Sequence, residues 1–240
     1  MQTRPPMVVE RFSRGDRGLV VVCAVVIALG TAIGATLFSR AFPEASIDFR
    51  VTREEARRTA ERALAARGFD VAGRKALGVF DHDDDAKVFL ERELGLTKAL
   101  PLLGREVPVW RWSFRFVNPL EKGELRAFVS PAGELLSFRR MLPERTPAAD
   151  AGPESARAMA EETIRTHRGL DPATLRFVEA TEEKRPARVD RTFVWESKAL
   201  RWNGASMRYL VEVQGDRVGR SSLWLEVPEA WRQSYSTLRS

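Results

Sequence analysis

The residues best suited to chemistry in this chain form the acidic run "DHDDD" at positions 81–85. Its four carboxylates and one imidazole could hold a hard divalent cation. The spacing does not match an EF-hand loop, and no second set of ligands is evident elsewhere in the sequence. The same acids stand where a helix is expected to begin, and there they would cap free backbone N–H groups and complement the helix dipole. We therefore favour capping over metal binding.

No other recognised catalytic pattern occurs in the sequence. The two histidines, His82 and His167, form neither an H-E-x-x-H nor an H-x-x-x-H pair, and the single cysteine is Cys23. A zinc site needs three or four ligands. No serine lies in G-x-S-x-G, and neither a G-x-x-x-x-G-K-[ST] phosphate loop nor a G-x-G-x-x-G motif is found. We therefore expect no catalytic, cofactor-binding or metal-binding residue.

The charge pattern argues against a nucleic-acid partner. The net charge is +6 and the isoelectric point is about 10.0, values that on their own suggest nucleic-acid binding. No dense basic run interleaved with aromatic residues appears, however. The charged stretch 182–191, "EEKRPARVDR", is expected to be a solvated loop between two strands rather than an anion site. The six tryptophans favour core positions over a binding groove.

Residues 18–39 contain no charged side chain and are expected to form a transmembrane helix. At 1.5 Å per residue, such a segment spans roughly 30 Å, the thickness of a bilayer core. A cleaved signal peptide is the alternative, but its apolar core is usually shorter. Gly30 and Gly34 form a G-x-x-x-G pair, which either lets a second helix approach or is ordinary membrane-helix glycine. Four arginines precede the span, so residues 1–17 are predicted to be cytoplasmic and the bulk of this single-pass protein of the cell (inner) membrane to be extracytoplasmic.

Two near-identical tetrapeptides organise the rest of the chain, "RGFD" at 67–70 and "RGLD" at 168–171. Each is expected to close an amphipathic helix, with Gly68 and Gly169 in the left-handed conformation after the last turn. Thr52 and Glu55 have the spacing of a capping box at the start of the first helix.

Antiparallel strands are expected after each helix. The stretch "VWRWSFRF" at 109–116 alternates aromatic and polar residues, as a half-buried strand does. Turns are predicted at 130–133 and 214–216, each within a hairpin. The fold class is therefore α+β: one N-terminal transmembrane helix followed by two repeated units, each a helix on an antiparallel sheet. The expected boundaries are 50–144 for the first unit, with an inserted helix near 83–95; 145–153 for a linker with little to bury; 154–230 for the second unit; and 231–240 for the start of a C-terminal helix.

This arrangement resembles the PepSY-type fold, which implies an extracytoplasmic domain connected with proteases and their regulation. The segments "PVWRWSFRFVNPLEKGELRAFVSPAGELLSFRRMLPE" and "LEVPEAWRQSYSTLRS" are also similar to the region before the catalytic membrane core of some bacterial CPBP (CAAX-type) intramembrane metalloproteases. That core carries an E-E-x-x-x-R motif, whereas Glu54 and Glu55 are followed here by Thr59 at the arginine position. The resemblance therefore implies a non-catalytic part, and no catalytic residue of the family is carried over.

The expected function is a membrane-anchored extracytoplasmic domain that regulates an intramembrane metalloprotease or presents substrate to it. The alternative is a free-standing, membrane-tethered binding module for a peptide or envelope protein. The expected partners are the lipid bilayer, through residues 18–39, and a protease core or peptide. No cofactor is expected.

Overall fold

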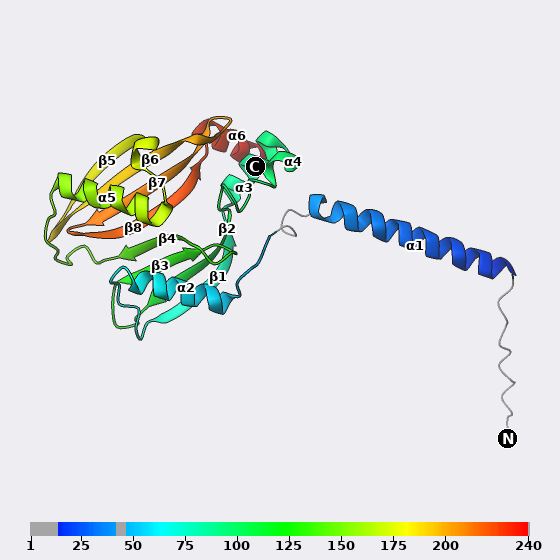
Figure 1. Cartoon of the computed structure of the whole chain (residues 1–240), viewed down its shortest axis with the longest axis horizontal. Helices are drawn as coiled ribbons and strands as arrows, with labels where there is room; N and C mark the ends of the chain where they lie inside the picture. Colours follow the sequence, from blue (N-terminus) through cyan, green and yellow to red (C-terminus); the bar gives the residue numbers. More distant parts are fainter. Residues whose placement is uncertain (1–13, 42–46, 240) are drawn as a thin grey trace, which may run out of the picture. The chain divides into compact units, whose positions relative to one another are not determined.

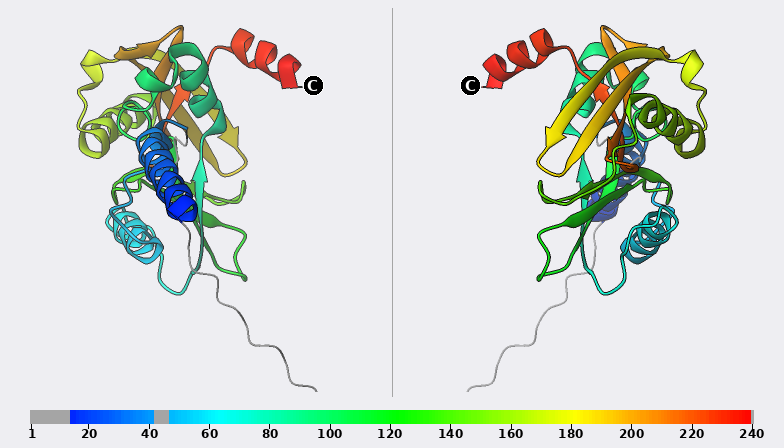
Figure 2. Two further views of the ribbon diagram at one scale, coloured as in Figure 1. Left: turned by 90° about the vertical axis from the view of Figure 1, so that its right-hand side faces the viewer. Right: turned by 90° about the vertical axis from the view of Figure 1, so that its left-hand side faces the viewer.

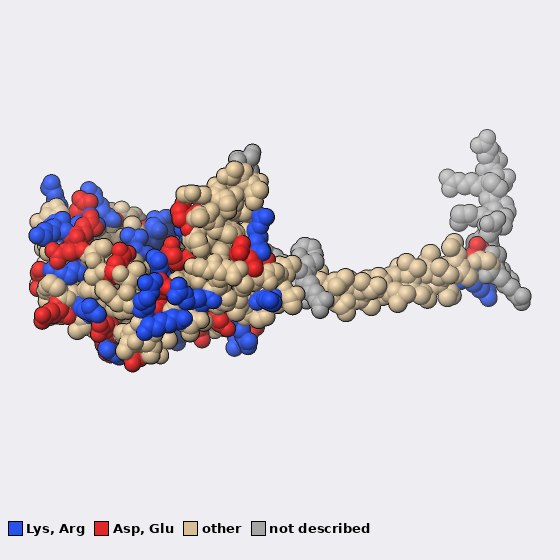
Figure 3. All heavy atoms as spheres, turned by 90° about the horizontal axis from the view of Figure 1, so that it is seen from above, with Lys and Arg blue, Asp and Glu red and all other residues tan. Residues whose placement is uncertain are grey.

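The computed structural model describes residues 14–41 and 47–239, which fall into two compact units divided after Ser46. In the first unit, α1 (Arg14–Ala41) contains a stretch, Gly15–Phe38, with a mean hydropathy of 2.5. Among the described residues this is the one helix long and apolar enough to cross a membrane, which supports a single-pass membrane protein. Figure 3 shows its surface free of charged side chains along most of its length. Residues 1–13, on which the predicted orientation depends, lie outside the described part.

The second unit is built on one antiparallel sheet of eight strands (Figure 1). Their order across the sheet is β1-β2-β3-β4-β8-β7-β6-β5. The strands are β1 (Lys75–His82), β2 (Trp110–Val117), β3 (Glu124–Val129), β4 (Leu135–Met141), β5 (Arg176–Arg185), β6 (Arg188–Trp202), β7 (Ala205–Gln214) and β8 (Arg217–Glu226). The α+β class with an N-terminal apolar helix is confirmed, and the sheets of the two halves join into one.

The join between the two half-sheets is short. Strands β4 and β8 pair only at Phe138↔Ser221 and Arg139↔Arg220, whereas β6 and β7 pair over most of their length. Other contacts must therefore hold the halves together. They come from α5, from the segment that connects the halves, and from α3 (Asp84–Leu94), whose Phe89 and Leu90 are buried in the core of the second half.

Two helices cover one face of the sheet, one for each half. These are α2 (Arg53–Ala65) and α5 (Pro153–Arg168), and both views of Figure 2 place them on the same side. The other helical segments are α3 (Asp84–Leu94), α4 (Leu96–Ala99), the short η2 (Pro172–Thr174) and α6 (Glu229–Arg239). Helix α3 occupies the segment in which an inserted helix was expected, and α6 begins two residues before the expected C-terminal helix.

Small residues let both helices lie close to the sheet. Ala56, Ala60 and Leu64 of α2 are fully buried against aromatic residues of the first half, including Phe114. In the second half Ala156, Ala160 and Ile164 of α5 do the same over a core that contains Trp195, which is 1% exposed. Burying one such aromatic side chain contributes about 1.5–3 kcal/mol. The prediction of core tryptophans is confirmed for Trp195 and for Trp110, which is also buried.

The local signals read from the sequence are present. The Thr52 hydroxyl accepts a hydrogen bond from the Glu55 backbone, and the Glu55 carboxylate accepts one from the Thr52 N–H. Gly68 and Gly169 have φ angles of 75° and 64°, in the left-handed region. The predicted turns join β3 to β4 and β7 to β8.

The segment between the halves is held more firmly than the sequence suggested. The Arg188 guanidinium donates hydrogen bonds to the carbonyls of Pro143, Glu144 and Thr146. It also forms an ion pair with Asp190, at 2.9 Å, and both side chains are buried. Residues 145–153 are themselves exposed or half-buried, as expected, and hydrogen bonds rather than burial hold this segment. The expectation of a solvated loop at 182–191 is wrong, because these residues end β5 and begin β6.

Candidate anion-binding cleft

Two hollows open near the C-terminal end of α2, and both have Gly68 and Phe69 in their walls. The first has a volume of about 320 Å³ and is lined by residues 68–70, 74, 121–125 and 140–143. The second has a volume of about 360 Å³ and is lined by residues 67–69, 138, 163, 166, 167, 217 and 218. The second hollow therefore lies between the ends of α2 and α5, over the join of the two half-sheets.

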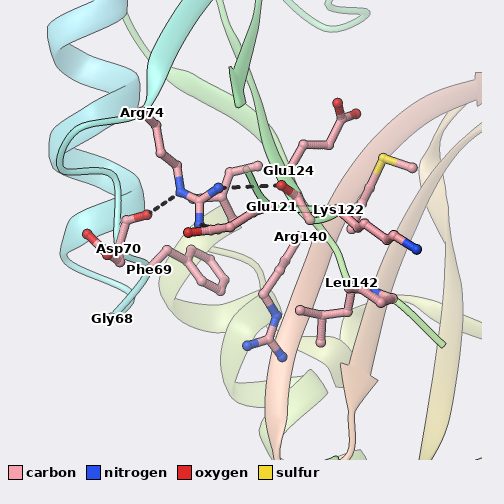
Figure 4. Close-up of a pocket in the computed structure, with 13 residues that line it drawn as sticks. Gly68, Phe69, Asp70, Arg74, Glu121, Lys122, Glu124, Arg140 and Leu142 are labelled. Carbon is pink, nitrogen blue, oxygen red and sulfur yellow. Dashed lines mark hydrogen bonds and ion pairs between the residues drawn. The ribbon is translucent and has the colours of Figure 1, made fainter. Parts of the chain in front are cut away.

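One arginine of the first hollow is fully engaged by the protein itself. Figure 4 shows Arg74 reaching the turn after α2 and the β2–β3 loop. Its Nε donates to the Asp70 carbonyl at 2.8 Å, and its Nη2 forms an ion pair with Glu121 at 2.6 Å. Arg74 thus fastens the tetrapeptide 67–70 to the sheet and is not free to bind a ligand.

Four other arginines surround this region without a carboxylate partner among the described residues. They are Arg67, Arg140, Arg168 and Arg217, and we call them together the arginine cleft. Arg67 and Arg217 line the second hollow, and Arg140 lines the first, where Figure 4 shows it beside Phe69. Arg168 lies near enough to Arg67 for the two charges to repel.

Aromatic rings and neutral acceptors hold these guanidinium groups in place. The Arg67 guanidinium lies 4.9 Å from the centre of the Phe138 ring, and it donates to the Ala63 carbonyl at 2.7 Å. The Arg140 guanidinium lies 5.7 Å from the Phe69 ring and donates to the Gln214 side chain at 3.1 Å. Such contacts orient a cation and leave its charge uncompensated.

Arg67 and Arg217 are exposed, whereas Arg140 and Arg168 are half-buried, and burial of a charge is unfavourable. Burial, followed by the nearby charges of Arg217 and Arg188, lowers the pKa of Arg140, and the charges of Asp190 and Asp216 offset part of this change. Burial also lowers the pKa of Arg67. The pKa of Arg168 falls to about 10, mainly through burial, and its Nε and Nη2 atoms are buried without a hydrogen-bond partner. A buried guanidinium that lacks a counter-charge is costly, and an anion in the cleft would relieve that cost.

Helix termination accounts for the glycine of the repeated tetrapeptide, and the cleft accounts for its arginine. Its first residues are Arg67 and Arg168, so both copies deliver an arginine to the same region. The sequence alone did not identify these residues, because an arginine in the last turn of a helix is commonly read as a partner of the helix dipole. The repeat itself was the available signal.

A histidine and a serine meet beside the cleft, and their geometry indicates a structural role. The His167 Nδ1 lies 2.9 Å from the Ser221 Oγ of β8, and its Nε2 lies 3.2 Å from the Leu135 carbonyl of β4. A nucleophilic serine needs an accessible hydroxyl and a base that titrates near neutral pH. Ser221 is 1% exposed, and burial with the charges of Arg168 and Arg67 lowers the pKa of His167 to about 3. The pair instead ties α5 across the short β4–β8 join.

This buried histidine predicts a loss of stability in mild acid. The unfolded chain has a histidine pKa of about 6.5, whereas the native value is about 3, so the unfolded state binds more protons between these limits. Stability is therefore full above pH 6.5 and falls below it. We expect the contribution of His167 to decrease by roughly 2 kcal/mol between about pH 7.5 and pH 5.

The measurement is urea unfolding of the full chain in micelles at both pH values, compared with His167→Gln. Glutamine keeps a donor for the Leu135 carbonyl but does not titrate, so the variant should lose less stability over the same range. Equal losses in both proteins would exclude His167 as the cause.

The acidic run 81–85 lies elsewhere, at the start of α3. The Asp83 side chain accepts a hydrogen bond from the Ala86 N–H at 3.1 Å, so the capping interpretation is confirmed for Asp83. Asp81 pairs with Arg111 and Asp85 with Arg232, while Asp84 contacts His82. Within the part of the chain that the structure describes, no group of three or more candidate ligands converges on one point.

Comparisons with known proteins give one distant structural likeness. No family model matches the chain, and no curated protein matches its sequence. Among solved structures, the chain is similar to the Bacillus megaterium YpeB C-terminal domain, with a TM-score of 0.43 and 11% sequence identity. The match covers 72% of this chain and 62% of that one.

Proposed function

We propose that this protein is a membrane-anchored, non-catalytic binding domain whose arginine cleft holds a carboxylate of an extracytoplasmic protein or peptide. The observation that supports this most is the set of four cleft arginines without carboxylate partners among the described residues. A guanidinium binds a carboxylate through two parallel, charge-assisted hydrogen bonds. Phe69, which is 8% exposed and lies in the wall of both hollows, offers a small apolar edge to the group that carries the carboxylate.

A peptide fits this site better than a small metabolite. The two hollows are open, they share one wall, and they run along the ends of α2 and the β3–β4 hairpin. An extended chain can occupy both at once, with its acidic group beside Arg67 and its neighbouring side chain beside Arg140. The bilayer-spanning α1 would keep such a partner near the membrane.

A more specific form of the proposal is that the partner belongs to an intramembrane metalloprotease, which the domain regulates or supplies with substrate. The support for it is the sequence resemblance to the region preceding CPBP-type protease cores, together with the candidate membrane span. The two forms differ in the partner alone, so cross-linking from a cleft residue such as Thr163 in native membranes separates them. A protease core among the products supports the specific form, and an unrelated envelope protein supports the general one.

The cleft predicts an unusual pair of effects for Arg168→Met. Methionine removes a buried charge without a partner and keeps most of the side-chain volume, so the free energy of unfolding should rise by about 1 kcal/mol. Arg168 lines neither hollow, but its charge lies near Arg67, so anion affinity should fall about tenfold when this attraction is lost. If Arg168 stabilised the fold, the same substitution would lower the free energy of unfolding.

The probe for this experiment is benzoate, which joins one carboxylate to an apolar ring. Full-length protein in zwitterionic nanodiscs is titrated by ligand-observed NMR, with benzamide as the neutral counterpart. Arg67→Gln is expected to weaken benzoate binding as Arg168→Met does. The matched control is Arg165→Gln, on the exposed side of α5, where the arginine already pairs with Glu161 and Glu162. Benzamide binding as well as benzoate, or equal losses in the control, would refute the proposal.

A further inference from the structure

Four arginines form a continuous row across the sheet, separate from the cleft. The strand register places Arg115 of β2 opposite Arg126 of β3, Arg126 opposite Arg139 of β4, and Arg139 opposite Arg220 of β8. Neighbouring strands are about 4.8 Å apart, so the four Cα positions cover roughly 14 Å. We call these residues the arginine row. It crosses the join between the two halves.

The row lies on the face of the sheet opposite α2 and α5. Side chains alternate between the faces of a strand. Phe114 and Phe138, which adjoin Arg115 and Arg139 in sequence, pack with the buried residues of α2. Ser221, next to Arg220, contacts His167 of α5. The arginine row therefore points away from both helices and away from the cleft.

The protein compensates only part of this charge. Glu124 pairs with Arg115 and with Arg126, each at 2.5 Å. Arg220 donates to the Ser222 hydroxyl at 2.9 Å. Burial together with the Arg139 charge lowers its pKa, and Glu212, which stands opposite it on β7, offsets part of this change. Arg139 has neither an ion pair nor a hydrogen bond among the described side chains. Like charges opposite each other on adjacent strands repel, and here three consecutive pairs do so.

Exposed apolar side chains continue the row at the edge of the sheet. Leu77 of β1 stands opposite Arg115, and Val79 stands opposite Ser113, so both share the face of the row. Leu77 is 44% exposed and Val79 is 63% exposed. Strand β1 is the edge strand of the sheet on the side of the first half. A cationic surface bordered by exposed aliphatic residues matches the chemistry of a membrane interface, where cations meet phosphates and short apolar groups enter between headgroups.

We propose that the arginine row docks this domain on anionic lipid headgroups, with Leu77 and Val79 entering the interfacial layer. Lipid is favoured over an acidic protein because the same chain carries a helix able to cross a membrane, which keeps a headgroup surface near the domain. Guanidinium groups bind phosphate through paired hydrogen bonds, and the attraction adds up over several arginines. Docking would present the opposite face, with the cleft, to partners in solution. The inference does not depend on what the cleft binds.

Docking can be measured on the full chain with a fluorophore at the edge of the row. Val79→Cys is labelled in a Cys23→Ser background, and the protein is placed in nanodiscs of phosphatidylcholine with or without phosphatidylglycerol. Quenching by headgroup spin-labelled lipid reports proximity to the bilayer. We expect strong quenching only with the anionic lipid, and its loss at high salt. The double variant Arg139→Gln/Arg220→Gln should lower the ratio of docked to free domain by about tenfold.

The matched control removes two charges from the other face, in Arg157→Gln/Arg165→Gln on α5. It should quench like the unmodified protein. Equal quenching in both lipid mixtures, or the same loss in the control, overturns the proposal. The proposal is also overturned if a soluble polyglutamate peptide binds the row and anionic lipid does not. The occupant would then be an acidic protein segment. Benzoate binding at the cleft stays intact in every case if that site is independent.

Discussion

Replacing Arg188 with methionine is expected to lower the free energy of unfolding by about 3–5 kcal/mol, because it breaks a buried ion pair by removing one partner. Arg188 is 7% exposed and Asp190 is 5% exposed, and the Arg188 Nε lies within 3.1 Å of both Asp190 oxygens. The variant would leave the Asp190 carboxylate buried. It would also remove the shared donor of three backbone carbonyls, those of Pro143, Glu144 and Thr146.

Urea unfolding of the full chain in micelles measures this loss. The control is Arg185→Met, because Arg185 also contacts Asp190, at 3.4 Å, but is more exposed. It should cost about 1 kcal/mol or less. Adding Asp190→Leu to Arg188→Met should restore part of the stability, since no buried charge then remains unpaired. If the single variant costs no more than Arg185→Met, the segment between the halves is not held by Arg188.

Local structure was the part of the fold that sequence could predict. The capping box at Thr52, the left-handed glycines and the hairpin turns depend on residues within a few positions of each other. The alternation in 109–116 marks one strand face, and Phe114 and Phe116 are indeed buried. These signals are short-range, so one sequence is sufficient to read them.

The join between the halves was not predictable in the same way. Strand β4 lies beside β8, about 80 positions later in the chain, and that pairing has no local signal. Strand β1 was also missed, because Gly78 interrupts its apolar pattern. A glycine is needed there, since a Cβ would collide with the Phe114 ring.

The candidate site depends on the same long-range geometry. Arg67 and Arg168 look like ordinary residues of a final helical turn until the two helix ends are seen to meet. Arg188 and Arg191 lie in a stretch that reads as solvated, yet both are buried. Composition counts arginines, but it cannot tell which of them have a carboxylate within reach. Arg188 has a carboxylate partner and stabilises the fold, whereas Arg168 has none and its burial is unfavourable.

The second large effect is expected for Gly215→Ala in the β7–β8 turn, at about 3 kcal/mol of lost stability. Gly215 has φ of 69°, where alanine is strained by about 1–2 kcal/mol. A Cβ there would also collide with the Ala148 side chain and lie 2.7 Å from the Ala149 carbonyl oxygen, so the connecting segment would have to move. That movement adds an overpacking cost of about 1–3 kcal/mol.

Gly169→Ala is the matched control, because Gly169 has a similar φ of 64° and open space where its Cβ would be. It should lose only the conformational part, about 1–2 kcal/mol. The excess in Gly215→Ala therefore isolates the contact with the connecting segment. Arg188 holds the same segment, so the two sites should be coupled. The double variant Gly215→Ala/Arg188→Met should therefore lose less stability than the sum of the losses in the two single variants. Full additivity would mean that the turn and the arginine act on separate structures. The connecting segment would then no longer explain why the two halves, which share so short a strand pairing, hold the cleft in one geometry.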